Sequence, residues 1–175
     1  MFTHEPKGYV CPLCRIAQGK PTDRGSQEAE VVLRNDVVTA FVAGKWRKSN
    51  PGHVVVIPNV HVENLYDLPE NLGHAIFDVS KRIAIALKEA YGCDGVSTRQ
   101  HNEPAGNQDV WHYHLHVVPR YEGDNFYLNH ENVYWPTAEE KRPFADKLKR
   151  YFDNSVLGPG IEPGTSSSSG TRSTN

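Results

Sequence analysis

Cysteine is scarce in this chain, and long apolar runs are missing. Only three cysteines occur in 175 residues, two of them in a single Cys11-x-x-Cys14 motif, which argues against a disulfide-stabilised scaffold. No apolar stretch approaches the roughly 20 residues that a membrane-spanning helix needs, and residues 1–7 lack the apolar core of a signal peptide. We therefore expect a soluble, cytoplasmic protein with no membrane partner.

A strong excess of either charge is also lacking. The formal net charge is −2, which gives no general attraction to a nucleic-acid backbone and predicts no nucleic-acid partner. Any phosphate chemistry must therefore come from a local site. The length favours one domain, predicted over residues 1–153, and the Gly-, Pro- and Ser-rich residues 154–175 are expected to form a disordered tail.

Hydrophobic periodicity predicts one long helix. Apolar residues recur every three or four positions over residues 72–90, which places one apolar stripe on a helix surface. Asp67 is the expected capping residue before Glu70, and Gly92 is the expected stop. A second, C-terminal helix is predicted over residues 137–152.

Short runs rich in β-branched residues predict four or five strands around that long helix. They cover residues 29–34, 37–43, 53–58, 95–100 and 110–119. The first two are expected to form a hairpin with a two-residue turn at Asn35-Asp36. This order of elements predicts an antiparallel α+β domain.

Three histidines at alternate positions form the strongest chemical signal. His112, His114 and His116 would stand on one face of a strand, with Tyr113 and Leu115 turned toward a core. A neutral imidazole is a nucleophile toward phosphorus when a neighbour holds its other nitrogen, and adjacent rings can supply protons. The preceding loop can offer backbone N–H groups to a phosphate, and His53 could add a fourth imidazole.

The Cys11-x-x-Cys14 motif is ambiguous when taken alone. It is compatible with zinc binding, with redox chemistry, or with neither. No βαβ pattern surrounds it, which weakens the redox interpretation.

Two segments resemble the histidine triad (HIT) superfamily, and the likeness covers about residues 10–122. They are the run His112-Tyr113-His114-Leu115-His116-Val117-Val118 and the run Pro51-Gly52-His53 with its apolar strand to Pro58. The continuation Pro119-Arg120 is most similar to the fragile-histidine-triad and dinucleoside polyphosphate hydrolase branch. The resemblance implies a five-stranded antiparallel sheet, pairing into a two-fold homodimer, and reaction of purine nucleotides through a nucleotidyl-histidine intermediate.

The resemblance also implies a role for each catalytic histidine. His114 would attack the α-phosphorus, and His116 and His53 would contact phosphate oxygens and assist the leaving group. His112 would orient the nucleophile through its backbone carbonyl. The basic residues near Arg47, together with Arg120, are open candidates for contacts with distal phosphates.

Nucleotide-binding residues are expected in the loop before the triad. By resemblance, Asn102 would lie near the ribose and phosphate, Gln108 would contact phosphate, and Gly106 belongs to the anion-binding turn. Family members often carry Ser or Thr at the position of Asp109, where a carboxylate would repel phosphate unless it is protonated or paired.

Some bacterial HIT proteins pair a cysteine knuckle with two histidines. Here this implies a structural Cys₂His₂ zinc site formed by Cys11, Cys14, His61 and His112. His112 can serve both sites, because its ring can ligate zinc while its carbonyl accepts a hydrogen bond.

Three functions remain open at this point. The first is hydrolysis of dinucleoside polyphosphates or, second in order, adenosine phosphoramidates. The alternative is a purine nucleotide-binding regulatory module with little turnover. Asp109 leaves this alternative open, because family members often carry Ser or Thr at that position. A transferase acting on a sugar phosphate is disfavoured, because that branch usually has Gln where this chain has His116.

Overall fold

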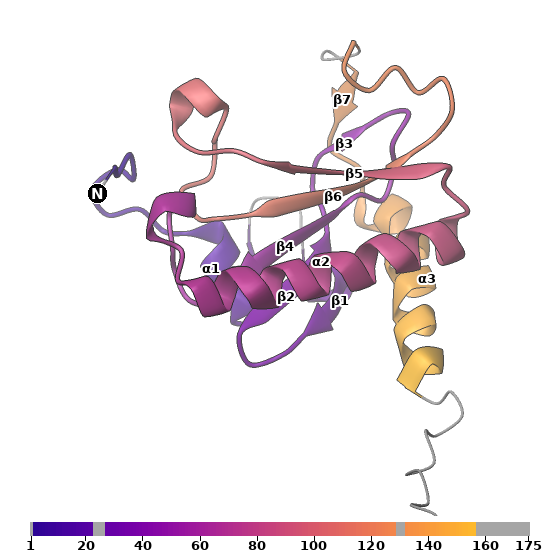
Figure 1. The fold of residues 1–175 in the computed structure, drawn as a ribbon, viewed down its shortest axis with the longest axis horizontal. Helices are drawn as coiled ribbons and strands as arrows, with labels where there is room; N and C mark the ends of the chain where they lie inside the picture. Colours follow the sequence, from indigo (N-terminus) through magenta and orange to yellow (C-terminus); the bar gives the residue numbers. More distant parts are fainter. Residues whose placement is uncertain (1, 23–26, 129–131, 157–175) are drawn as a thin grey trace, which may run out of the picture.

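A five-stranded antiparallel sheet forms the centre of the computed structural model, which describes residues 2–22, 27–128 and 132–156 (Figure 1). Its strands, in spatial order, are β1 (Val31–Arg34), β2 (Val38–Val42), β4 (Val54–Pro58), β6 (Leu115–Arg120) and β5 (Gly95–Gln100). The long helix α2 (Glu70–Tyr91) packs along the sheet, and α3 (Ala138–Val156) packs against α2 and β1. The predicted α+β class and five-stranded antiparallel sheet are confirmed.

Short helices occupy the connections. They are α1 (Pro12–Ala17) and the 3₁₀ segments η1 (Glu28–Glu30), η2 (Leu65–Asp67) and η3 (Pro104–Gly106). Among the described residues, no helix combines the length and apolar character needed to cross a membrane.

The first hairpin forms as predicted, but its turn lies one residue later. Asn35 N–H donates to the Val38 carbonyl at 3.0 Å, so Asp36 and Val37 are the central residues. The Asn35 side chain accepts from the backbone N–H groups of both Val37 and Val38, which stabilises this position. The first strand also begins at Val31, because η1 takes up the preceding residues.

Helix α2 buries the predicted apolar stripe against the sheet. The fully buried members include Ile76, Ile83 and Leu87. The helix ends at Gly92, whose φ of 68° is left-handed and therefore suits glycine. The expected cap was wrong, because Pro69 precedes the first turn without a side-chain cap and Asp67 belongs to η2.

The histidine segment is extended only in its second half. Strand β6 begins at Leu115, whereas the predicted strand began five residues earlier. Tyr113 N–H donates to the Val62 carbonyl, outside the sheet. The His112 ring is completely buried beside the Pro58 carbonyl, where the next ladder bonds with β4 would otherwise form. His112 therefore does not share a strand face with His116.

A second, two-stranded sheet escaped the sequence analysis. It pairs β3 (Trp46–Arg47) with β7 (Val133–Tyr134) beyond the main sheet (Figure 1). Strands of two residues are too short to show periodicity in a sequence. Helix α3 includes residues 154–156, which the sequence predicts to be tail, and the remainder of that predicted tail lies outside the described residues.

Candidate functional site

Three imidazoles surround one cleft where β4 and β6 begin. The His114 and His116 rings lie 5.1 Å apart, and the His53 and His116 rings lie 5.3 Å apart. Nδ1 of His116 is 3.2 Å from Nε2 of His53, so one of these nitrogens donates to the other. Antiparallel pairing of Val54 with Val117 brings the two chain segments together.

His114 has the geometry of a nucleophile. Its Nδ1 lies 2.7 Å from the His112 carbonyl oxygen, which can only accept, so Nδ1 carries the hydrogen and Nε2 keeps its lone pair. Burial lowers the pKa of His114, which keeps the ring neutral at pH 7. The side chain lines the cleft described next.

The cleft in front of His114 has a volume of about 250 Å³ and a largely apolar wall. We call it the nucleoside cleft. The apolar residues that line it are Leu13 and Ile16 from α1, Phe41 from β2, Ala43 directly after β2, Val55 from β4, Val110 and Trp135. Such a wall suits a planar, apolar group next to a reactive polar centre.

The His53–His116 pair is also uncharged at neutral pH. Burial, followed by the nearby Arg47 and Arg99 guanidinium groups, lowers the pKa of His53 to about 4. Burial and the neighbouring His114 and His53 rings hold the pKa of His116 well below its ordinary value. Bound phosphate would oppose the effect of the arginines and increase the proton affinity of both rings.

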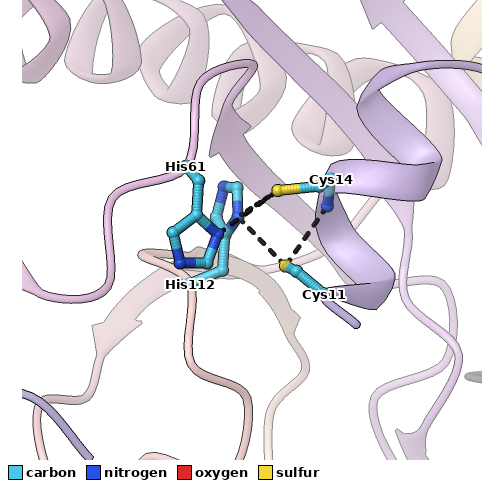
Figure 2. Close-up of side chains that lie close together, drawn as sticks. All are labelled: Cys11, Cys14, His61 and His112. Atoms are coloured by element: carbon cyan, nitrogen blue, oxygen red, sulfur yellow. Dashed lines mark hydrogen bonds between the residues drawn. The ribbon is translucent and has the colours of Figure 1, made fainter. Parts of the chain in front are cut away.

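His112 points away from the cleft and into a second cluster. Figure 2 shows its ring with His61 beside the thiols of Cys11 and Cys14. Its Nδ1 lies 3.3 Å from the Cys11 sulfur and 3.4 Å from the Cys14 sulfur, and His61 Nδ1 lies 3.3 Å from the Cys14 sulfur. All four candidate ligand atoms lie within 4.8 Å of one another. A tetrahedral zinc ion separates such ligand atoms by about 3.3–3.8 Å, so the cluster fits one.

Partners outside the cluster orient both of its histidines. His61 Nε2 lies 2.8 Å from the Glu5 carboxylate, and His112 Nε2 lies 3.0 Å from the Pro58 carbonyl. Both partners accept from Nε2–H, which leaves each Nδ1 free to ligate a metal. The hydrogen bond between the thiols lowers the pKa of Cys11 and raises that of Cys14, so Cys11 gives up its proton more readily than Cys14, and the thiolate is the form that metals bind.

The loop residues expected to bind nucleotide divide into two groups. Gln108 is buried, and its amide bonds the Glu103 N–H and the carbonyls of Glu63 and Val110. Asn102 likewise bonds Gln100 and the Leu65 N–H.

Neither amide is part of the cleft wall, whereas Asp109 is. The Gly106 carbonyl lies 2.7 Å from Nδ1 of His101.

Two wall residues were missed or underweighted in the sequence. Asn107 lines the nucleoside cleft and has a left-handed φ of 68°. His101 also lines the cleft, with the centre of its ring 6.2 Å from that of His116. Its place directly after β5 was the available signal, because that strand pairs with the histidine strand.

The sequence matches a known family model and several known proteins. The family model described as HIT domain matches residues 24–123. A Bacillus subtilis relative named Protein hit is 32% identical over 135 residues, which cover 76% of this chain and 84% of that protein. An adenosine 5'-monophosphoramidase of Saccharomyces cerevisiae is 30% identical over 57% of this chain and 58% of its own length. A bis(5'-adenosyl)-triphosphatase of Dictyostelium discoideum is 28% identical over 67% of this chain and 76% of its own length.

Solved structures share the fold. A Hit-like protein from Bartonella henselae is 31% identical, with a TM-score of 0.58 over 69% of this chain and 84% of that chain. A histidine triad nucleotide-binding protein from Sulfolobus tokodaii is 20% identical, with a TM-score of 0.71 over 89% of this chain and 100% of that chain.

Proposed function

Because this chain belongs to the HIT domain family, we propose that it is a nucleotide hydrolase or nucleotidyltransferase acting at the α-phosphate of a purine nucleoside. The observation that carries the proposal is the state of His114. Its ring is neutral, its Nδ1 hydrogen is held by the His112 carbonyl, and it borders an apolar cleft. The phosphoramidase and triphosphatase names of two relatives support the same reaction class.

In the proposed reaction, Nε2 of His114 attacks the α-phosphorus and forms an N–P bond. The bond from that phosphorus to the leaving group breaks, and its electron pair goes to the leaving atom. The proton for that atom is delivered through the His53–His116 pair, whose nitrogens are 3.2 Å apart. Water then attacks the phosphorus and gives a proton back to the His53–His116 pair. The N–P bond breaks and its electron pair returns to Nε2, so His114 regains its neutral form.

Asp109 fits this scheme as a partner of the nucleophile. Its carboxylate raises the pKa of His114 and so offsets part of the effect of burial. Attack leaves positive charge on the ring, which a nearby carboxylate stabilises. We propose that Asp109 has this role and does not bind phosphate directly.

We further propose that Cys11, Cys14, His61 and His112 bind one structural zinc ion. Support comes from the ligand spacing and from the two partners that orient the histidines. The ion would contribute no chemical step. It would fix α1 and His112 in place, and it therefore supports both the cleft wall and the nucleophile.

Homodimerisation through the sheet remains a proposal as well. Strand β5 is a terminal strand of the main sheet, with β6 as its partner there. Pairing of two such strands would give the two-fold sheet that the family resemblance implies. Light scattering on the purified chain measures the mass directly.

The test of the proposed function is His114→Ala with His74→Ala as the matched control. His74 is exposed on α2 and lies outside the cleft lining. We expect turnover of diadenosine triphosphate and of an adenosine phosphoramidate to fall at least about a thousandfold in His114→Ala, with no change in the control. Quenching in an alkaline denaturant, in which an N–P bond to imidazole survives, should trap a nucleotidyl group on the wild type and the control but not on His114→Ala. Retained turnover in His114→Ala would refute the assignment, and a wild type that binds these nucleotides without turnover would favour the regulatory module.

A further inference from the structure

Helix α3 lies outside the part of the chain that matches the family model, yet one of its side chains packs on the segment that carries His53. A Cβ atom added to Gly52 would lie only 2.3 Å from Cδ1 and 2.8 Å from Cγ of Phe144. Carbon atoms in contact are about 3.5–4.0 Å apart, so the Phe144 ring fills the space into which a side chain at this position would project. The Phe144 ring therefore packs directly on the backbone of the residue before His53.

Two neighbouring aromatic residues hold the Phe144 ring in place. The Trp46 ring lies 5.0 Å from it and the Tyr91 ring 5.3 Å from it, both in edge-to-face geometry. Trp46 is buried, and the Tyr91 hydroxyl donates to the Phe144 carbonyl at 3.0 Å, with the Gly52 carbonyl 3.4 Å away. Both α2, through Tyr91, and α3 thus fix the ring that contacts Gly52.

The segment before β4 is anchored at its two ends, and Gly52 lies between the anchors. At the first end, the Asn50 side chain donates to a carbonyl of β6 at 2.9 Å. At the second, the His53 carbonyl accepts from the backbone N–H of the residue after β2 at 2.9 Å. Gly52 has a left-handed φ of 77° and no side chain of its own to hold it. Contact with Phe144 therefore limits how the backbone turns immediately before His53.

We propose that Phe144 is a positioning residue for His53, whose ring it keeps within hydrogen-bond distance of His116. This inference rests on the proposed function, in which the His53–His116 pair delivers the proton to the leaving group. Nε2 of His53 and Nδ1 of His116 are 3.2 Å apart, and a hydrogen bond is lost when such a distance exceeds about 3.5 Å. Phe144 is not among the described residues that line the two pockets beside His116, so it acts through Gly52 and not on the substrate.

The kinetic test compares two leaving groups in Phe144→Leu. The amine of an adenosine phosphoramidate must take up a proton as it leaves, whereas 4-nitrophenolate leaves from the 4-nitrophenyl ester of adenosine monophosphate without one. We expect kcat/KM for the phosphoramidate to fall at least about tenfold, because misplacement of a general acid slows only the step that needs its proton. The value for the ester should change less than about threefold.

Phe152→Leu is the matched control, because Phe152 is a second half-buried ring on α3 and is not among the nearest neighbours of Gly52. It should match the wild type on both substrates. Equal losses on the two substrates in Phe144→Leu would show a structural role only and would overturn the proposal, as would no loss on either. Phe144→Met, which also removes the ring but keeps much of its apolar volume, takes the place of Phe144→Leu if that variant does not fold.

Crystal structures of the two leucine variants measure the position of His53 without any turnover. We expect the distance between Nε2 of His53 and Nδ1 of His116 to lengthen beyond about 3.5 Å in Phe144→Leu and to stay as it is in Phe152→Leu. An unchanged distance in Phe144→Leu would overturn the proposal even if turnover falls. If the wild type turns over neither substrate, the proposed function fails, and this distance still decides whether Phe144 positions His53.

Discussion

The two ends of the histidine segment lie in opposite environments. His112 is completely buried in the Cys/His cluster, and both histidines of that cluster have a second partner on the far side of the ring. His116 lines two open pockets, one of which is also lined by Arg47 and Arg99. The histidines of the Cys/His cluster are hydrogen-bonded within the chain, whereas the pockets beside His116 are open to a ligand. Stability and binding are thus separated by only a few residues of sequence.

The largest expected effect comes from breaking the closed region. Cys14→Ser should remove bound zinc and lower the free energy of unfolding by about 3–5 kcal/mol, a fraction of the 10–16 kcal/mol seen for zinc-finger peptides. Metal analysis and urea denaturation measure both effects. Cys93→Ala is the control, because Cys93 is buried outside the cluster. Zinc content that Cys14→Ser leaves unchanged would contradict the site.

The second-largest effect should come from acidification, which lowers the free energy of unfolding through His53. The pKa of His53 is lowered to about 4, with burial as the main cause, so the folded chain binds this proton less readily than the unfolded chain. The contribution of His53 to the free energy of unfolding is complete above the unfolded pKa of about 6.5. It is lost as the pH falls toward 4, and the loss amounts to up to about 3 kcal/mol.

Urea denaturation at several pH values measures this loss. His53→Gln should flatten the slope between pH 6.5 and 4, although His116, 3.2 Å away, and the charges of Arg47 and Arg99 also contribute to it. An identical slope in His53→Gln and wild type would contradict the assignment to His53.

A smaller effect, on zinc affinity, is expected when Glu5, the hydrogen-bond partner of His61, is changed. Glu5→Gln deletes the carboxylate that accepts from His61 and should weaken zinc affinity about 10- to 100-fold. Competition with a chelator measures this change. Glu139→Gln, which alters an exposed carboxylate on α3, should leave the affinity as it is. Equal affinities in both variants would count against the role of Glu5.

The smallest effect should have the opposite sign. Arg99→Gln removes one of the crowded positive charges and should raise the free energy of unfolding by up to about 1 kcal/mol. Arg120→Gln should instead lower it, because Asp124 would lose its ion pair. Thermal unfolding of the two variants makes the comparison, and a clear loss of stability in Arg99→Gln would mean that the arginine has a structural role.

Much of the fold was predictable because its signals are local. The stripe on α2, the Gly92 stop and the boundaries of β5 follow from periodicity and backbone preferences. The start of β6 could not be predicted in this way, because it depends on where the His112 ring inserts beside the Pro58 carbonyl. That insertion is a tertiary contact, and alternation in the sequence continues through it unchanged.

The candidate site was predictable in its residue types but less so in its surroundings. The cluster of Cys11, Cys14, His61 and His112 forms as the family resemblance implied. Gln108 has a side chain that the backbone of its own loop engages, and no pattern of residue types reports that. The pocket lined by Arg47, Arg99 and Phe126 joins β3, β5 and the segment after β6, and only the folded chain brings these three segments together.

The hydrogen bond from His114 to the His112 carbonyl has a consequence for entropy. A freely rotating imidazole would have to lose its rotameric freedom in each catalytic cycle. Here the carbonyl belongs to a residue whose own ring is immobilised, so that freedom is lost once, during folding. In the proposed reaction, the activation entropy for attack would therefore contain little from the nucleophile itself.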